Sequence, residues 1–500
     1  MSSSEDENYV EESSSDAMEE SEGADVTSPQ QFAGLIRYYI NALMQGEISV
    51  ADMPFEIEGL DQLQDDDDDE DEDYEFDDEE RGTATAGDPS KLKVETPGGT
   101  DLEHTIRVDS GKTSQHIPQN HLQLLSERSH SARSPPVWKT LMTQDYIPQF
   151  SRNWDRYRNQ IFCGRFSRSG QVFMSACQDR VIRIYDYHSG KKTKEIQARN
   201  IGWSIIDTDY SPDQRWLIYS SWSEYIHLCN ITGENNTHDA LDMRPEDNRF
   251  CLFSVKFSPD SREILGGSSD RHIYIYNLER REVEMRIEGH RDDINTVTYA
   301  EEDNSNLIIT GSDDRLCRVW DRRTMSDQRR TTAVGNFSGH SSGITHVSSK
   351  GDGRYFISNG KDHSLKLWDI RMGRPGIQAG RRADQVPDTS LMTYTGHSVS
   401  QTLIRAYFSP VQSTGARYIY SGSYNGNIYI WDVLTGEVVK KLEAHEATIR
   451  DLSWHPTEPV IMSTSWDATV KKWTVNPEGK EQEEPVRRRR NRNWFYDDDE

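Results

Sequence analysis

Three segments of this chain repeat a set of residues that could be mistaken for a catalytic triad. In each set an aspartate precedes a tryptophan by six residues, and a histidine precedes the aspartate by 22 to 24 residues. An acyl-transfer triad would also need an exposed nucleophile and an oxyanion site. Repetition of one set along the chain is typical of a structural device, so we expect no catalytic residue and no enzyme activity. The three sets are His290, Asp314 and Trp320; His340, Asp362 and Trp368; and His445, Asp467 and Trp473.

The tryptophans belong to a longer series of positions that recur 42 to 63 residues apart. A period of about 40–45 residues with a Trp-Asp signature predicts WD repeats, each forming one four-stranded blade. Because one blade cannot bury both faces of its sheet, the blades must stack, and seven of them close a ring. The sequence therefore predicts an all-β fold, a seven-bladed WD-repeat β-propeller, over residues 131–476. The seven marks are Tyr185, Cys229, Tyr276, Trp320, Trp368, Trp431 and Trp473.

In WD-repeat proteins the repeated histidine, aspartate and tryptophan join a strand hydroxyl in a buried hydrogen-bond network. Thr310, Ser358 and Ser463 are expected to supply this hydroxyl. The sixth blade has Asn425 in place of the aspartate, and the first three blades lack the Gly-His step and should depend more on packing alone. No phosphate-binding loop and no metal-ligand spacing is present in the sequence, so we expect neither cofactor nor metal.

A W-D-x-R motif ends the third strand of two consecutive blades. Arg323 follows Trp320-Asp321 and Arg371 follows Trp368-Asp369. The motif resembles the mark of substrate receptors for cullin-4 ubiquitin ligases, which dock on the damaged-DNA-binding adaptor. Adjacent blades would place the two guanidinium groups at one edge of the disc, where they can pair with carboxylates or carbonyls. The alternative is that each arginine pairs with an acid of its own blade.

Residues 1–130 hold 35 acidic and 7 basic side chains, so all of the net charge of −28 lies there and the propeller is neutral on average. That balance argues against broad capture of nucleic acid. We expect a mostly disordered acidic tail with a helix over about 29–45, and a linker over 82–136 with a short helix near 120–127. The apolar face of the first helix either docks on a partner or folds back on the propeller. This face carries Phe32, Leu35, Ile36 and Tyr39.

The chain beyond the repeats carries few further signals. Val137–Asn153 is expected to supply the outer strand that closes the ring, and residues 372–392 are an insertion in the fifth blade. Residues 477–500 form a charged tail whose Arg487–Arg492 run favours nuclear entry beside a cytoplasmic pool. Five cysteines without a C-x-x-C pair indicate a reducing compartment. The sequence shows no apolar run long enough to span a membrane.

Several stretches within residues 160–475 resemble one family, that of WD-repeat protein 23, also called cullin-4-associated factor 11, and its plant relatives. The most specific are Tyr219–His227, Phe173–Asp179 and Trp320–Met325. The resemblance implies a substrate receptor that bridges the damaged-DNA-binding adaptor and a protein marked for ubiquitination and proteasomal degradation. Stress-response basic-leucine-zipper transcription factors are among the family's substrates. The alternative from the sequence is a scaffold of a nuclear chromatin or RNA-processing assembly.

The resemblance also distributes roles over the surface of the disc. Arg323, Arg371 and their aspartates Asp321 and Asp369, together with the helix at Phe32–Tyr39, would contact the adaptor. The opposite, top face would hold the substrate, with Tyr424 and Trp466 as an aromatic anchor. The alternative for Trp466 is that it covers the top of its blade. Candidates on this face are Gln178, Lys361, Tyr424 and Trp466.

Overall fold

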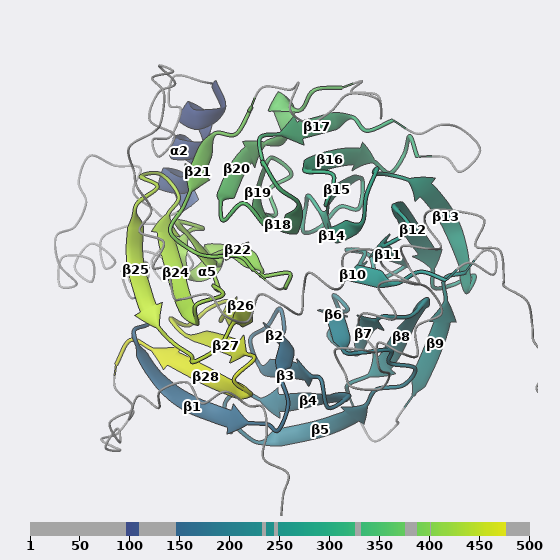
Figure 1. Cartoon of the computed structure of the whole chain (residues 1–500), viewed down its shortest axis with the longest axis vertical. Coiled ribbons are helices and arrows are strands. Elements are labelled where there is room, and N and C mark those ends of the chain that lie inside the picture. The colour runs from purple at the N-terminus through teal and green to yellow at the C-terminus, as the bar shows by residue number, and fades with distance from the viewer. Residues whose placement is uncertain are drawn as a thin grey trace, which may run out of the picture. The chain divides into compact units, whose positions relative to one another are not determined.

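The structure, a computed structural model, describes residues 97–109, 147–232, 237–244, 249–325, 332–375, 388–400 and 402–476. These residues form seven antiparallel four-stranded sheets arranged as blades around a central channel (Figure 1). The all-β, seven-bladed propeller expected from the repeat period is confirmed. The expected helix over 29–45, the short helix near 120–127 and the tail after 476 lie outside the described residues.

Each blade contains four strands, which follow one another in the sheet from the channel to the outer edge. The innermost strands are β2 (Ile161–Phe166), β6 (Ile205–Tyr210), β10 (Leu252–Phe257), β14 (Ile294–Tyr299), β18 (Ile344–Ser349), β22 (Ala406–Phe408) and β26 (Ile449–Trp454). The second strands are β3 (Val172–Cys177), β7 (Trp216–Ser221), β11 (Glu263–Ser268), β15 (Leu307–Ser312), β19 (Tyr355–Gly360), β23 (Tyr418–Ser421) and β27 (Ile461–Ser465).

The third strands carry the seven aromatic or cysteine marks. They are β4 (Val181–Asp186), β8 (Tyr225–Asn230), β12 (His272–Asn277), β16 (Leu316–Asp321), β20 (Leu365–Asp369), β24 (Asn427–Asp432) and β28 (Thr469–Thr474). The outer strands are β5 (Lys192–Gln197), β9 (His238–Asp242), β13 (Glu282–Glu288), β17 (Gly335–Ser338), β21 (Met392–Tyr394), β25 (Val438–Glu443) and β1 (Phe150–Arg156). Short helices are η3 (Ile370–Met372) and α5 (Val411–Thr414).

The hydrophobic core lies between the blades. Seven clusters of buried side chains in the described residues each take members from two neighbouring blades. The second strands are buried along almost their whole length because they are covered on both faces. Outer strands such as β25 are mostly exposed, with Leu442 as the one buried residue of β25, as expected where one face meets solvent.

The ring is closed by an N-terminal strand. β1 pairs with β28, with Phe150 opposite Thr474, so the first described strand completes the seventh blade. The strand occupies Phe150–Arg156 rather than Val137–Asn153, and it contains a register shift between Asn153 and Asp155. Strands from the two ends of the propeller therefore hold each other, which a simple linear stack of repeats cannot do.

We name the two faces by their turns. The bottom face carries the turns that follow the third strands, where the Trp-Asp pairs end. The top face carries the turns between the second and third strands. Helix α2 (Pro97–Asp109) packs beside blades five and six, near β21 in Figure 1. The sequence analysis placed residues 82–136 in a linker and did not predict this helix.

Candidate functional site

The two W-D-x-R arginines adopt the same geometry on the bottom face. The Arg323 guanidinium donates from Nε and Nη2 to the two carboxylate oxygens of Asp321, at 3.0 and 2.7 Å. Arg371 makes the same bonds to Asp369, at 3.1 and 2.8 Å. Each aspartate also accepts the backbone N–H of its arginine. Each arginine thus pairs with an acid of its own blade, which was the alternative expected from the sequence, and this pairing fixes the direction of both guanidinium groups.

Neither arginine is sealed in the disc. The side chain of Arg323 is 68% exposed and that of Arg371 is 52% exposed, so both can meet a partner. The preceding arginine differs: Arg322 pairs with Glu263 and Glu284 of blade three, at 2.7 and 3.0 Å, and is mostly buried. Of the two consecutive arginines in blade four, Arg323 is thus the one available at the surface.

The two aspartates meet different environments. The hydrogen bond from Arg323 lowers the pKa of Asp321, whose side chain is partly exposed. Burial raises the pKa of Asp369, although Arg354 opposes this effect. Asp369 has no exposed surface and also accepts a bond from Arg354 at 3.4 Å. The blade-five motif is therefore the more enclosed of the two.

Helix α2 is the source of this enclosure. The carboxylate of Asp101 forms an ion pair with Arg371 at 3.1 Å and another with Arg354. Leu102 and Ile106, one turn apart on the helix, are fully buried among side chains of blades five and six. An element before the propeller in sequence thus contacts one of the two W-D-x-R motifs directly.

The amino-acid sequence carries little signal for this helix. Pro97 suits the first helical position, but Leu102 and Ile106 are the two buried apolar residues in a stretch of Gly, Thr and charged residues. The pairs that support the helix are local: Arg107 with Glu103, and the Thr105 hydroxyl with the carbonyl of Asp101. The helix over 29–45 that was expected at the adaptor, with Phe32, Leu35, Ile36 and Tyr39, lies outside the described residues.

The repeated His-Asp-Trp sets form hydrogen-bond chains inside blades four, five and seven. In blade four the Trp320 indole donates to the Thr310 hydroxyl at 3.0 Å, and His290 Nε2 lies 2.7 Å from that hydroxyl. His290 Nδ1 lies 3.0 Å from Asp314. Trp368, Ser358, His340 and Asp362 repeat these contacts, as do Trp473, Ser463, His445 and Asp467.

Burial governs the charge of these groups. It lowers the pKa of His290 despite the nearby Asp314, so the imidazole is neutral and its Nδ1–H can donate to the carboxylate. Burial alone would raise the pKa of Asp314, but His290 and Arg318 outweigh it and lower that pKa to about 2. The hydroxyl of Thr310 is fully buried and cannot reach a substrate. The geometry is that of a turn-fixing network.

Other blades use different polar contacts. The Trp431 indole of blade six donates to the carbonyl of Thr395, and His397 lies 2.8 Å from the amide oxygen of Asn359 in blade five. Blade one was expected to depend on packing alone. Instead the Tyr185 hydroxyl donates to Asp155 at 2.6 Å, so the closing strand takes part in its polar network.

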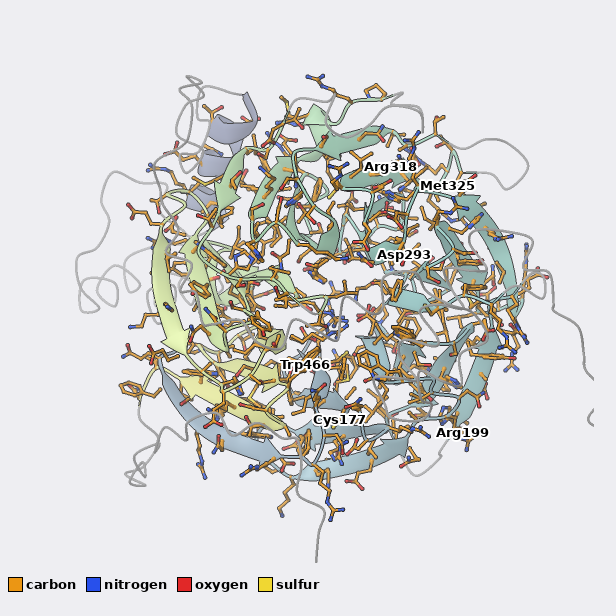
Figure 2. The ribbon with its side chains drawn as sticks, viewed as in Figure 1. Cys177, Arg199, Asp293, Arg318, Met325 and Trp466 are labelled. Carbon is orange, nitrogen blue, oxygen red and sulfur yellow. The ribbon has the colours of Figure 1, made fainter. Side chains whose placement is uncertain are left out.

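The four candidate residues on the top face differ in their exposure to solvent. Lys361 and Tyr424 are exposed and Gln178 is half-buried. Trp466, labelled in Figure 2, packs against the cluster between blades one and two, with its ring 5.6 Å from Phe162. This placement favours the alternative that Trp466 covers its blade. The exposed tryptophans of this face are Trp203 and Trp222, which the sequence reasoning missed.

Neither a metal site nor a membrane span stands out. In the described part of the chain, no group of three or more His, Cys, Asp or Glu side chains is placed to hold a metal ion. No helix among these residues is long and apolar enough to cross a membrane. All five cysteines are free, and four of them are buried.

Comparison with known proteins agrees with this architecture. The family model "WD domain, G-beta repeat" matches residues 150–186, 247–277, 281–321, 331–369, 388–432 and 436–474. The LEC14B protein of Lithospermum erythrorhizon is 40% identical over 353 residues, which cover 64% of this chain and 73% of that protein. The DDB1- and CUL4-associated factor 11 homolog of Caenorhabditis elegans is 33% identical over 432 residues, which cover 79% of this chain and 74% of that protein.

Proposed function

The chain belongs to the family of WD-repeat proteins that includes DDB1- and CUL4-associated factor 11 and LEC14B, and we propose that it is a substrate receptor of a cullin-4 ubiquitin ligase. In this role the bottom face binds DDB1 and another face holds the protein to be ubiquitinated. The chain supplies no chemistry of its own. It raises the effective concentration of the substrate beside the ubiquitin-charged machinery.

The observation that carries the proposal is the pair of exposed guanidinium groups on adjacent blades. Each is held at two points by its own aspartate, so little side-chain freedom is lost when a partner binds. The outward N–H groups of Arg323 and Arg371 remain able to donate to carbonyls or carboxylates of DDB1. Arginines held in this way are typical of interaction hot spots.

Helix α2 extends the proposed surface beyond the blades. Arg371 forms ion pairs with both Asp101 of the helix and Asp369 of its own motif, so the helix and the motif form one continuous patch. In the described part of the chain, Asp101 forms no ion pair with Arg323, which lies on the neighbouring blade. The two arginines therefore have distinct roles in the proposal: Arg323 meets DDB1 while held by Asp321 of its own blade, and Arg371 does so as part of a helix-supported cluster.

The test is the double variant Arg323→Ala with Arg371→Ala in the full chain. Co-purification with DDB1 should fall at least tenfold, since loss of two hot-spot arginines costs about 2 kcal/mol or more. Both side chains are more than half exposed, so the urea unfolding midpoint should change little.

Arg244 provides a matched control. It forms the same two-point pair with Asp242 two residues earlier, at 3.0 and 2.9 Å, but follows an outer strand of blade two. Arg244→Ala should leave DDB1 binding unchanged. Undiminished binding in the double variant, or an equal loss in Arg244→Ala, would refute the proposed docking surface.

A further inference from the structure

The top end of the central channel opens into a cavity of about 460 Å³. Its wall comes from loops and strand ends of several blades, which meet here because every innermost strand faces the channel. Residues that decide its chemistry are four aromatics and two bases: Phe162, Trp203, Trp222, Phe253, Lys361 and Arg450.

Two exposed indoles form one side of this cavity. Trp203 and Trp222 are 37% and 43% exposed, and their rings stand edge to face at 5.7 Å. Trp203 also contacts Phe162, with ring centroids 5.1 Å apart. Gly202 allows this approach, since a Cβ there would lie 2.6 Å from the carbonyl oxygen of Trp222. The rings are thus held by each other while much of their apolar surface meets water.

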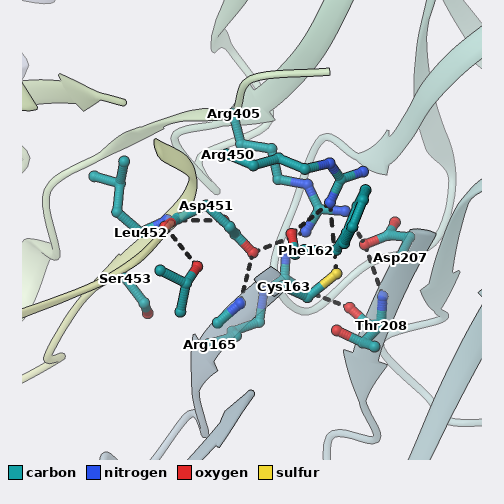
Figure 3. A network of polar contacts seen from close by, with 12 residues as sticks. Phe162, Cys163, Arg165, Asp207, Thr208, Arg405, Arg450, Asp451, Leu452 and Ser453 are labelled. Carbon is teal, nitrogen blue, oxygen red and sulfur yellow. Dashed lines mark hydrogen bonds and ion pairs between the residues drawn. The ribbon is translucent and has the colours of Figure 1, made fainter. Parts of the chain in front are cut away.

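The floor of the cavity carries a buried cation. Arg450 donates to the carbonyls of Phe162 and Ile206, at 2.5 and 2.9 Å (Figure 3). Its Nε has no hydrogen-bond partner among the described residues, and no carboxylate there pairs with it directly. The neighbouring Arg405, by contrast, pairs with both Asp207 and Asp451, at 2.7 and 3.0 Å.

The charges lining the two ends of the channel differ. Among the described residues, the charged side chains that line the top cavity are Lys361 and Arg450, and no carboxylate lines it. Lys361 already contacts Asp313 of the neighbouring blade, at 2.8 Å. The bottom end is lined by bases and acids together, and there Arg168 pairs with Glu302 at 3.1 Å. An anion would therefore find at the top one cation, Arg450, that no carboxylate of the described residues pairs with, whereas the cations at the bottom are already paired.

From these observations we propose that the top cavity is the substrate-recognition pocket and binds a peptide that presents an apolar side chain beside a carboxylate. The inference rests on the proposed receptor function and deepens it. The apolar side chain would cover Trp203 and Trp222, and the carboxylate would approach Lys361 and the floor at Arg450. Although aromatic walls alone could also hold a cation, the two basic residues disfavour one.

The experiment selects a random peptide library displayed on phage against the immobilised full chain. Enriched peptides should carry Asp or Glu within one or two positions of a large apolar residue. One such peptide, labelled with fluorescein, then gives a Kd by anisotropy. Replacing its acidic residue by the corresponding amide should weaken binding at least tenfold.

Variants of the chain locate the site. Trp203→Ala and Trp222→Ala should each weaken the labelled peptide by about 30-fold, as for an aromatic hot spot. Phe150→Ala is the control, because Phe150 is an aromatic residue that is 42% exposed on the outer strand β1 and does not line the cavity. It should change the Kd less than twofold. Retained DDB1 co-purification in the tryptophan variants separates this proposal from the proposed function and shows that the propeller is folded.

Several results would overturn the inference. These are enrichment of basic peptides, no enrichment at all, or acidic peptides whose binding Trp203→Ala and Trp222→Ala leave intact. Preferential binding of a single-stranded oligonucleotide over the labelled peptide would also overturn it, as would a self-association of the chain that Trp222→Ala abolishes, since a second copy would then occupy the cavity.

Discussion

Replacing Leu102 by alanine should release helix α2 from the propeller without unfolding the blades. Two kinds of contact hold the helix: the buried side chains of Leu102 and Ile106, and the ion pairs of Asp101. Burying a Leu or Ile side chain fully contributes about 1.5–3 kcal/mol, so the two supply at most about 3–6 kcal/mol. The ion pairs are between one-quarter and one-half exposed, and such pairs contribute about 0–1 kcal/mol each. The apolar contacts therefore dominate.

A Leu→Ala change at a buried site costs about 2–5 kcal/mol, which is comparable with the whole docking energy of the helix. Hydrogen–deuterium exchange of the amides in residues 99–107 should consequently approach that of an unprotected segment in Leu102→Ala. Asp101→Asn removes two ion pairs that contribute about 2 kcal/mol at most, so it should accelerate the same amides less than about 30-fold. Glu103→Ala is the control, because Glu103 pairs with Arg107 on the same helix. Strand amides should keep their protection in all three variants.

If Asp101→Asn exposes the helix as much as Leu102→Ala does, ion pairs outweigh burial and the ranking of the two contacts is refuted. The functional consequence follows from the same ranking. If α2 belongs to the DDB1 surface, Leu102→Ala should weaken DDB1 binding more than Asp101→Asn, although neither Leu102 nor Ile106 has exposed surface with which to touch a partner.

Two further predictions concern the network in blade four. Thr310→Val keeps the shape of the side chain but leaves the Trp320 indole and His290 Nε2 without their partner, so the urea midpoint should fall by the equivalent of about 2–4 kcal/mol; Thr310→Ser should lose about 1 kcal/mol, and equal losses would show that the hydroxyl is unimportant. Acid should also weaken the network. The pKa of Asp314 is lowered to about 2 in the folded protein, so its stabilisation is complete above about pH 4, the range of an unfolded carboxyl, and is lost as the pH falls toward 2. Burial lowers the pKa of His290, so the folded protein favours the neutral ring. Its contribution to the free energy of unfolding therefore begins to fall at a higher pH, below about pH 6.5, where the histidine of the unfolded chain takes up a proton. A series of urea midpoints should decline from pH 7 to pH 3, with a shallower acid limb in Asp314→Asn, and a flat profile would contradict these signs.

The number of blades was predictable because the spacing of the repeats is kept even in blades that lack the Trp-Asp pair. Blade two has Cys229 at the mark, and no matched WD40 segment covers residues 205–242, yet it forms a full four-stranded sheet. Its buried strands retain the apolar pattern that each blade needs on both faces. Closure by an N-terminal strand was also predictable. The last repeat ends with its third strand, so the outer strand of the seventh blade must come from another part of the chain. Its register was not, because several polar-rich segments before Ile161 could fill the same edge.

Helix α2 and the tryptophan pair were missed for different reasons. Two apolar residues, Leu102 and Ile106, are too few to reveal a helix by periodicity, and their burial depends on a gap between blades five and six that no local pattern records. Trp203 and Trp222 are separated in sequence, one between blades one and two and the other in a turn of blade two. They meet because the segment before β6 and the turn between β7 and β8 lie together at the top of blade two, a contact that equivalent turn positions alone do not reveal.

The bottom face and the top cavity are connected by the ion pairs that fill the channel between them. Four basic side chains (Arg165, Lys256, Arg405 and Arg450) share its interior with three carboxylates (Asp207, Asp209 and Asp451). Arg405 joins Asp207 of blade two to Asp451 of blade seven, so it holds strands that are not neighbours in the ring. Breaking such a buried pair leaves an uncompensated charge and is strongly unfavourable. The innermost strands are therefore fixed relative to one another, and a receptor that acts through proximity requires this: a substrate held at one face must keep a constant distance and direction from machinery bound at the other.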